Sequence, residues 1–369
     1  MKSKHLKMTK YLRIILASVL VDVLFALAFR VRVISDFYVE HIFHFAADIY
    51  GRMTGIFPFS VGEVFISLAV LMLLTELVLT GLFCFFKKKP KVLLFYKVYS
   101  KSLLVIALFV VWLMIMNCSA LFRTSRMNVN GNQGKKYGIE QVRILRNFLA
   151  EKCNDLSGKV KRDEYGNVKS NGDIQAEAKV ALRNLASEFP RLAGFYPNPK
   201  AMLGSYMMYQ SGYDGVYFPF TMEANYNRYI SDSRLPHVIC HELAHLKGYI
   251  YEDEADYIAY RACVDSKNEQ LKYAGYLAVL GYIENDYCAL TDGKLEGDIE
   301  ILDVVWKDAC SYTDQMREQL EKKESVISTE TVETMGEEFT DTYMDYYEST
   351  PNYDEVTKLL LAYYDGILY

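Results

Sequence analysis

The 369-residue sequence has no Cys-x-x-Cys pair, no internal repeat and no basic patch that compensates for its formal charge of −5. The charge balance argues against a nucleic-acid partner. Without Cys-x-x-Cys spacing, the seven cysteines do not form the paired-thiol motifs of small metal or redox sites. One or two disulfides can form if the soluble part lies outside the cell, but we expect Cys240 and Cys263 to be buried free thiols.

The sequence also lacks a small-residue cleavage site after its first apolar stretch, near residues 12–29. A basic start followed by an apolar run is typical of signal peptides, but this run is longer than a signal core, and Arg30 and Arg32 follow it. We therefore predict a membrane span. Asp22 lies within it and is expected to face another helix or water, because a charge in lipid is costly.

Two further apolar stretches, near residues 61–86 and 103–121, are each long enough to cross a hydrocarbon core of about 30 Å. Glu76 lies in the first of them, and with Asp22 it is expected to make contacts between helices rather than an ion path. Between the first and second spans, near residues 36–50, apolar and polar residues alternate. This pattern predicts an amphipathic helix at the membrane interface, with its histidines on the polar face.

Lysines fix the expected orientation of the membrane region, residues 1–121. The Lys-rich N-terminus and the Lys-rich loop 87–101 are predicted to lie in the cytoplasm. Everything after residue 121 is then extracytoplasmic. The sequence therefore predicts a multi-pass plasma-membrane protein, with the lipid bilayer as one of its partners.

The rest of the chain reads as a linker, residues 122–138, followed by a predominantly α, α+β domain over residues 139–369 with a small sheet. Residues 201–210 and 216–221 form two short runs on either side of a Gly-containing loop, and this pattern predicts a hairpin. Pro219 places the second run at a sheet edge. The region 269–369 is expected to be mostly helical, with residues 359–364 docked on the domain.

One stretch of this domain carries chemistry, the run HELAH from His241 to His245. Pro236 is suited to the first turn of a helix and Gly248 to its end, so the run is predicted to be helical. Residues four apart share a helix face, so His241 and His245 can bind one zinc ion while Glu242 acts as the base. Three protein ligands and an open position for water are the pattern of zinc hydrolases.

The third ligand is expected at the start of the next helix, near residues 252–265. Glu252 and Asp256 are four apart and share a face. We predict that Glu252 is the ligand and that Asp256 accepts the ring N–H of a ligating histidine. Glu254 lies two residues from both Glu252 and Asp256 and therefore points to another side of the helix, which suits the surface better. It is the second candidate for the third ligand.

These residues resemble the Glu-zincin metallopeptidases, whose signature is HExxH followed by Glu-x-x-x-Asp. The resemblance implies His241, His245 and Glu252 as zinc ligands, Glu242 as base and Asp256 as their support. It also implies a zincin-like fold in which an upstream edge strand pairs with a peptide substrate. Only six residues separate His245 from Glu252, fewer than in thermolysin, so the connection must be a tight turn. The whole arrangement also resembles an uncharacterised family of bacterial membrane proteins.

Charged residues surround the motif, so it does not lie inside a membrane span as in intramembrane zinc proteases. The leading hypothesis is a membrane-anchored zinc metallopeptidase that hydrolyses peptide or protein substrates. The alternative is a non-catalytic envelope scaffold or sensor that retains a structural or relic zinc site. An open coordination position beside Glu242 discriminates between them.

Overall fold

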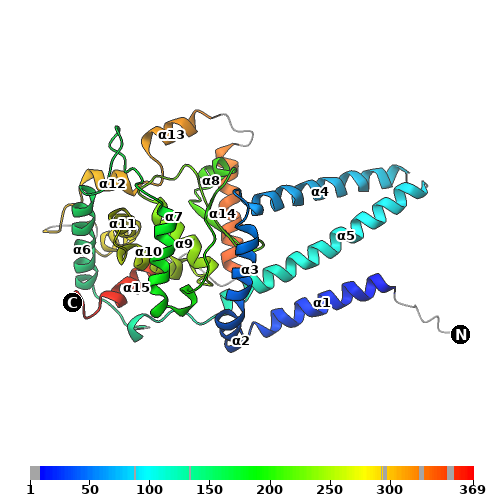
Figure 1. Cartoon of the computed structure of the whole chain (residues 1–369), viewed down its shortest axis with the longest axis horizontal. Helices are drawn as coiled ribbons and strands as arrows, with labels where there is room; N and C mark the ends of the chain where they lie inside the picture. The colour runs from blue at the N-terminus through cyan, green and yellow to red at the C-terminus, as the bar shows by residue number, and fades with distance from the viewer. Residues whose placement is uncertain are drawn as a thin grey trace. The chain divides into compact units, whose positions relative to one another are not determined.

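The computed structural model describes residues 9–86, 89–132, 134–291, 293, 297–323, 328–346 and 353–369, without the side chains of 339–346 and 353–354. The chain is mostly helical, with one small three-stranded sheet (Figure 1). It divides into two compact units. Unit 1 comprises Met1–Phe43, Val61–Ser125 and Pro219–Thr221, and unit 2 comprises His44–Ser60, Arg126–Phe218 and Met222–Tyr369.

Among the described residues of unit 1, three helices are long and apolar enough to cross a membrane, as the sequence predicted. They are α1 (Lys10–Ala28), α4 (Val61–Phe86) and α5 (Pro90–Met114), the last extended by a π-helical turn, Ile115–Ser119. The third helix therefore begins about four turns before the expected residue 103. Lys97 and Lys101 lower the apolar content of its first half, but they do not interrupt the helix that Pro90 starts.

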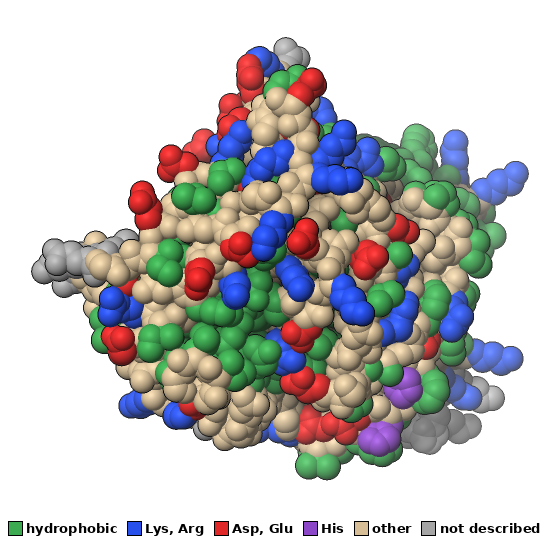
Figure 2. All heavy atoms as spheres, turned by 60° about the vertical axis from the view of Figure 1, so that its left-hand side comes forward, with side chains coloured by type: hydrophobic (Ala, Val, Ile, Leu, Met, Phe, Trp, Pro, Cys, Tyr) green, Lys and Arg blue, Asp and Glu red, His purple; other side chains and the backbone are tan. Residues whose placement is uncertain are grey.

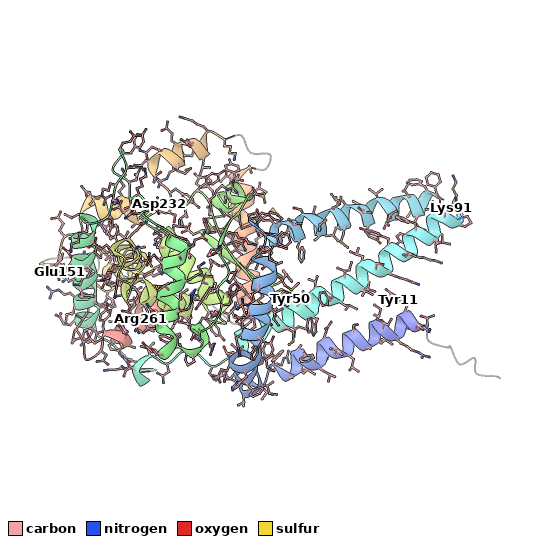
Figure 3. All side chains as sticks on the ribbon, in the orientation of Figure 1. Tyr11, Tyr50, Lys91, Glu151, Asp232 and Arg261 are labelled. Atoms are coloured by element: carbon pink, nitrogen blue, oxygen red, sulfur yellow. The ribbon has the colours of Figure 1, made fainter. Side chains whose placement is uncertain are left out.

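The three apolar helices pack against one another. Helices α4 and α5 form an antiparallel hairpin, and α1 lies against α5, where the Tyr11 hydroxyl donates to the Lys101 carbonyl at 3.4 Å. Tyr11 and Lys91, which begin α1 and α5, lie toward the same end of this bundle (Figure 3). Glu76 accepts a hydrogen bond from Ser100 Oγ at 2.7 Å, which is the contact between helices expected for this acid.

The segment expected as one amphipathic helix is divided between the two units. Helix α2 (Arg32–Tyr38) and a π-helical turn, Val39–Phe43, belong to unit 1, whereas α3 (His44–Thr54) belongs to unit 2. One face of α3 is buried in unit 2, and the buried Lys200 donates to the Thr54 carbonyl at 2.7 Å. The opposite face exposes three large apolar side chains, those of Phe45, Ile49 and Met53.

Unit 2 is built around the pair of helices that carries the HELAH run. This pair is α9 (Leu235–Leu246) and α10 (Glu252–Val264). Besides α3, the other α-helices among the described residues of unit 2 are α6 (Ile139–Ser157), α7 (Ile174–Asn184), α8 (Ser205–Gln210), α11 (Glu269–Thr291), α12 (Asp303–Ala309), α13 (Asp314–Glu321), α14 (Thr329–Tyr346) and α15 (Tyr353–Tyr364).

The core of unit 2 lies where α6, α10, α11 and α15 meet, and its buried side chains include Leu145, Leu149 and Tyr273. Burial of each such leucine contributes about 1.5–3 kcal/mol. Helices α10 and α11 approach closely at Gly275, where an added Cβ would lie 2.7 Å from Cys263 Cβ. The C-terminal helix docks as predicted, with Leu360 fully buried.

The sheet has the order β1-β3-β2, with strands Lys200–Ala201 (β1), Gly215–Phe218 (β2) and Glu223–Tyr226 (β3). The predicted hairpin was wrong in its first arm, because most of 201–210 forms α8. The antiparallel partner of β2 is β3, and Pro219 begins the turn between them. Strand β2 does lie at the sheet edge, as expected. The short, partly polar β3 gives no strand pattern in the sequence.

The stretch 122–138, expected as a linker, has little regular structure, but side chains of unit 2 fix its second half. The Asn130 amide donates to the Ala362 carbonyl at 3.0 Å, and Lys135 pairs with Asp365. The chain therefore enters unit 2 in a defined position.

The surface of unit 2 is charged, and its cysteines are free thiols. Acidic and basic side chains lie next to one another over much of the face of unit 2 shown in Figure 2. All seven cysteines are free. Cys240 and Cys263 are fully buried between α9 and α10, with their sulfur atoms 3.8 Å apart, in agreement with the expected buried thiols.

Candidate metal centre

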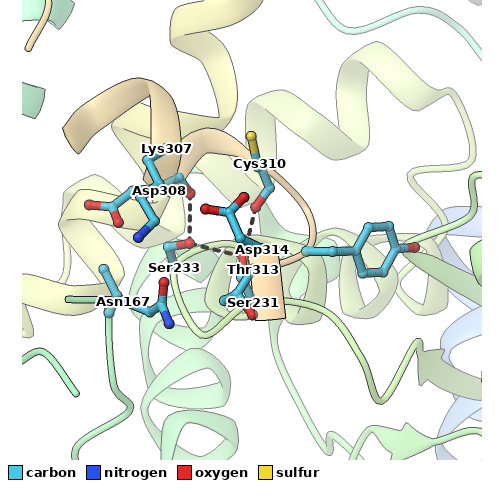
Figure 4. Close-up of a pocket in the computed structure, with 10 residues that line it drawn as sticks. Asn167, Ser231, Ser233, Lys307, Asp308, Cys310, Thr313 and Asp314 are labelled. Atoms are coloured by element: carbon cyan, nitrogen blue, oxygen red, sulfur yellow. Dashed lines mark hydrogen bonds between the residues drawn. The ribbon is translucent and has the colours of Figure 1, made fainter. Parts of the chain in front are cut away.

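Helix α9 is held in place at both ends. Pro236 lies in its first turn, and Gly248, with a φ of +88°, follows its last turn in the left-handed conformation that glycine adopts readily. The loop before α9 is attached to the α12 region, since Ser231 Oγ donates to the Cys310 carbonyl and Ser233 Oγ to the Asp308 carbonyl (Figure 4). The cavity beside these serines measures about 10 Å³, room for one water at most.

Three potential ligand atoms converge on one point between α9 and α10. They come from His241, His245 and Glu252, and all lie within 4.8 Å of one another. Glu252 Oε2 is 3.1 Å from His241 Nε2 and 3.6 Å from His245 Nε2. Ligands about 2.05 Å from a tetrahedral zinc ion are about 3.4 Å apart, so these separations fit that metal.

The Nδ1 atom of each histidine ring makes a hydrogen bond, and this contact directs Nε2 toward the point where the three ligand atoms meet. His245 Nδ1 lies 2.7 Å from the Tyr249 carbonyl oxygen, and because a carbonyl only accepts, Nδ1 carries the proton and Nε2 the lone pair. His241 Nδ1 lies 2.8 Å from Asp256 Oδ1. Such outer contacts hold metal-binding histidines in the ligating tautomer.

A short turn between α9 and α10 brings the three ligand residues together. The left-handed Gly248 reverses the chain after α9, and Tyr249 N–H then donates to the Ala244 carbonyl at 3.2 Å. Helix α10 starts only four residues after Gly248, at Glu252. The tight connection expected from the short spacing is therefore present, and it brings Glu252 to the imidazoles.

The two carboxylates beside the imidazoles, those of Glu252 and Asp256, have lowered pKa values. Partial burial acts to raise the pKa of Glu252, but the rings of His245 and His241 outweigh it and keep that pKa well below its usual range. Burial likewise acts against the charge of Asp256, and His241 outweighs it to lower the pKa of this carboxyl group. Both carboxylates are therefore ionised at neutral pH.

Glu242 lies beside the cluster in a different environment. Its side chain is buried, and Oε2 has no hydrogen-bond partner. Burial raises the pKa of Glu242 to about 7, although the adjacent His241 and His245 act to lower it. The first residue of β2 packs on this carboxylate, because a Cβ on Gly215 would lie 2.3 Å from Glu242 Oε1.

Two neighbouring residues lie outside the ligand group. The expectation that Glu254 suits the surface was wrong, because its carboxylate is buried, accepts from Met127 N–H at 2.8 Å and lies 3.4 Å from Arg126 Nε. The Glu254 carboxylate faces Arg126 and Met127 and not the two histidines. His237 lies in the first turn of α9, where burial lowers its pKa to about 3 and keeps the ring neutral.

Three contributors to the site carry no signal in the sequence. Gly215 gave no signal because a single glycine in a loop does not show what packs on it. The Tyr249 carbonyl is a backbone group, which motifs do not report. Arg126, which pairs with Asp253 beside Glu252, is more than a hundred residues away in sequence.

The comparisons with known proteins give a family and no function. No curated protein and no solved structure matches the chain significantly. Residues 38–361 match the profile of a family described as Protein of unknown function (DUF3810). The match spans most of the chain, including the last two apolar helices and the His241–Glu252 cluster, and the chain therefore belongs to the DUF3810 family.

Proposed function

We propose that this protein is a membrane-anchored zinc metallopeptidase, and that His241, His245 and Glu252 hold the zinc ion. The observation that carries the proposal is the convergence of these three ligand atoms next to the buried Glu242 carboxylate. Two imidazoles and one carboxylate are a donor set of catalytic zinc sites. Similarity to Glu-zincins in sequence supports the same assignment.

When bound, a zinc ion polarises a carbonyl and lowers the pKa of water. The chain itself supplies the proton transfers. Glu242 Oε2 has no partner and can take the proton of the attacking water. Glu242 then donates a proton to the amine that leaves as the peptide bond breaks.

Binding of an extended peptide has a natural place in unit 2. Strand β2 is the edge strand of the sheet, and its first residue, Gly215, packs on Glu242. A peptide added to a sheet edge is held by main-chain hydrogen bonds, which favour no particular sequence. Substrate selectivity would then depend on side-chain contacts around β2.

The alternative function, a non-catalytic scaffold or sensor with a structural zinc, requires a closed site. Structural zinc ions are almost always held by four protein ligands. Among the residues that the structure describes, the cluster offers three. The buried and unpartnered Glu242 oxygen beside it also favours catalysis over a purely structural role.

We further propose that unit 2 lies on the extracytoplasmic side of the plasma membrane. The three apolar helices fit a membrane protein. Lysines gather before α1 and around the connection between α4 and α5, and such loops face the cytoplasm. After α5 the chain would then continue outside.

Metal analysis of the full-length protein in detergent tests the proposal. We expect about one zinc ion per chain, lost in His241→Ala and His245→Ala. Glu242→Gln should retain the zinc and lose hydrolysis of a peptide library. A folded wild-type protein that binds no zinc would refute the metal centre, and zinc binding without hydrolysis by the wild type would favour the scaffold.

A further inference from the structure

A large cavity in unit 2 lies outside the candidate metal centre. It measures about 840 Å³, within the range of small-molecule sites. The cavity is open to solvent; α3 and α7 each form a wall, and residues 194–198 complete its lining. Its charged lining consists of Arg52, Lys179, Arg183 and Asp48.

The cavity has an excess of positive charge. Its one acid, Asp48, is already engaged, because Lys247 Nζ lies 3.4 Å from Asp48 Oδ1. Within the part of the chain that the structure describes, no carboxylate lies within ion-pair distance of Arg52, Lys179 or Arg183. Arg183 is close enough to Lys179 to act on the pKa of its ammonium group, and a bound anion would relieve this repulsion between cations.

The cations are held in place rather than mobile. The Arg52 guanidinium lies over the Phe195 ring, 4.2 Å from its centroid, and Arg183 faces the Tyr196 ring at 5.5 Å. Lys179 bonds to the Asn198 side chain, and its pKa is lowered by partial burial and by Arg183, against the effect of Asp173. Two guanidinium groups and an ammonium suit an anion with several acceptor oxygens, such as a phosphate.

Helix α3, which forms one wall of this cavity, also has the features of a helix that lies on a membrane surface. On α3, Phe45, Ile49 and Met53 repeat every four residues and are about 60% exposed. Ile56, which lines the cavity, is 79% exposed. Five residues after it, at Val61, the chain enters the candidate span α4. An apolar stripe beside cations is the pattern of helices that bind anionic lipid surfaces.

We propose that the cavity binds the phosphate of an anionic phospholipid, with Arg52, Lys179 and Arg183 as its ligands and the apolar stripe of α3 toward the acyl chains. The inference is independent of zinc binding. It assigns this side of unit 2 to the bilayer surface and gives the protein a preference for anionic membranes.

Lipid binding by the full-length protein tests this assignment. Delipidated protein in neutral detergent is mixed with phosphatidylglycerol or phosphatidylcholine, and the retained lipid is measured by native mass spectrometry. We expect the wild type to retain phosphatidylglycerol preferentially. Arg52→Gln and Arg183→Gln should each weaken that retention about tenfold, the loss of one charged hydrogen bond. Equal retention of the two lipids, or wild-type retention by both variants, would overturn the proposal.

Two controls separate the site from general charge and from soluble phosphate. Arg317→Gln removes an exposed arginine on α13 and should retain phosphatidylglycerol as the wild type does. Equal weakening in Arg317→Gln would point to bulk charge and refute a specific site. Glycerol 3-phosphate in tenfold excess should displace little lipid, and full displacement would assign the cavity to a soluble phosphate instead.

Discussion

His241 Nδ1 and Asp256 Oδ1 lie 2.8 Å apart, and this contact joins the two helices of the candidate metal centre. Helix α9 supplies the histidine and α10 the carboxylate, one turn beyond Glu252. The contact fixes the ring so that Nε2 points toward Glu252 Oε2, 3.1 Å away. The orientation of His241 therefore depends on how α10 packs against α9.

The first prediction concerns this contact. Asp256→Asn removes the negative charge that holds the His241 N–H, so we expect zinc affinity to fall about 10–100-fold. The measurement is competition with a chelator of known affinity. Asp303→Asn, at an exposed position in α12, makes the same chemical change away from the site and should leave the affinity unchanged. Unaltered affinity in Asp256→Asn would show that the aspartate does not support the ligand.

The second prediction distinguishes the two candidates for the third ligand. Glu252→Gln should abolish stoichiometric zinc binding, because its carboxylate faces both imidazoles. Glu254→Gln should keep the zinc but lower the free energy of unfolding by about 1–3 kcal/mol, since the buried Glu254 carboxylate loses the charge that pairs with the partly exposed Arg126. Zinc content and denaturant unfolding of both variants provide the measurement. Zinc loss in Glu254→Gln alone would reverse the assignment.

The parts of the site that sequence predicted are local in the chain. Pro236 and Gly248 delimit α9 through their own backbone preferences. Because only six residues connect His245 to Glu252, the chain must keep Glu252 close to the histidines. The helix near residues 252–265 was expected for a similar local reason, and residues 359–364 of α15 were expected to dock because they form an apolar run.

The parts that sequence missed depend on distant partners. Glu254 is buried because it contacts Met127, which is 127 residues away in sequence, and the adjacent Arg126. The cationic cavity is assembled from α3, α7 and the Gly194–Asn198 segment, none of which carries a motif. Strand β3 exists because β1 and β2 pair with its two edges. Periodicity within one segment contains none of this information.

The third prediction rests on the proposed hydrolysis and concerns Gly215. A Cβ at this position would lie 2.3 Å from Glu242 Oε1, so Gly215→Ala must displace the carboxylate. We expect zinc content to be kept and peptide hydrolysis to fall by about tenfold to a hundredfold, the effect of moving a reacting group by about 1 Å. Gly281→Ala is the matched control, because a Cβ there meets nothing within 4 Å. Full activity in Gly215→Ala would place the proton transfers elsewhere.

The last prediction tests the orientation in the membrane with single-cysteine proteins and a membrane-impermeant maleimide. Cys310 is exposed on unit 2, so intact cells should label it if unit 2 is extracytoplasmic. A cysteine in place of the exposed Lys91, at the start of α5, should react only after permeabilisation. Cys240 should stay unlabelled until the protein is denatured, because it is fully buried. Labelling of position 91 but not of Cys310 in intact cells would invert the topology and place the candidate metal centre in the cytoplasm.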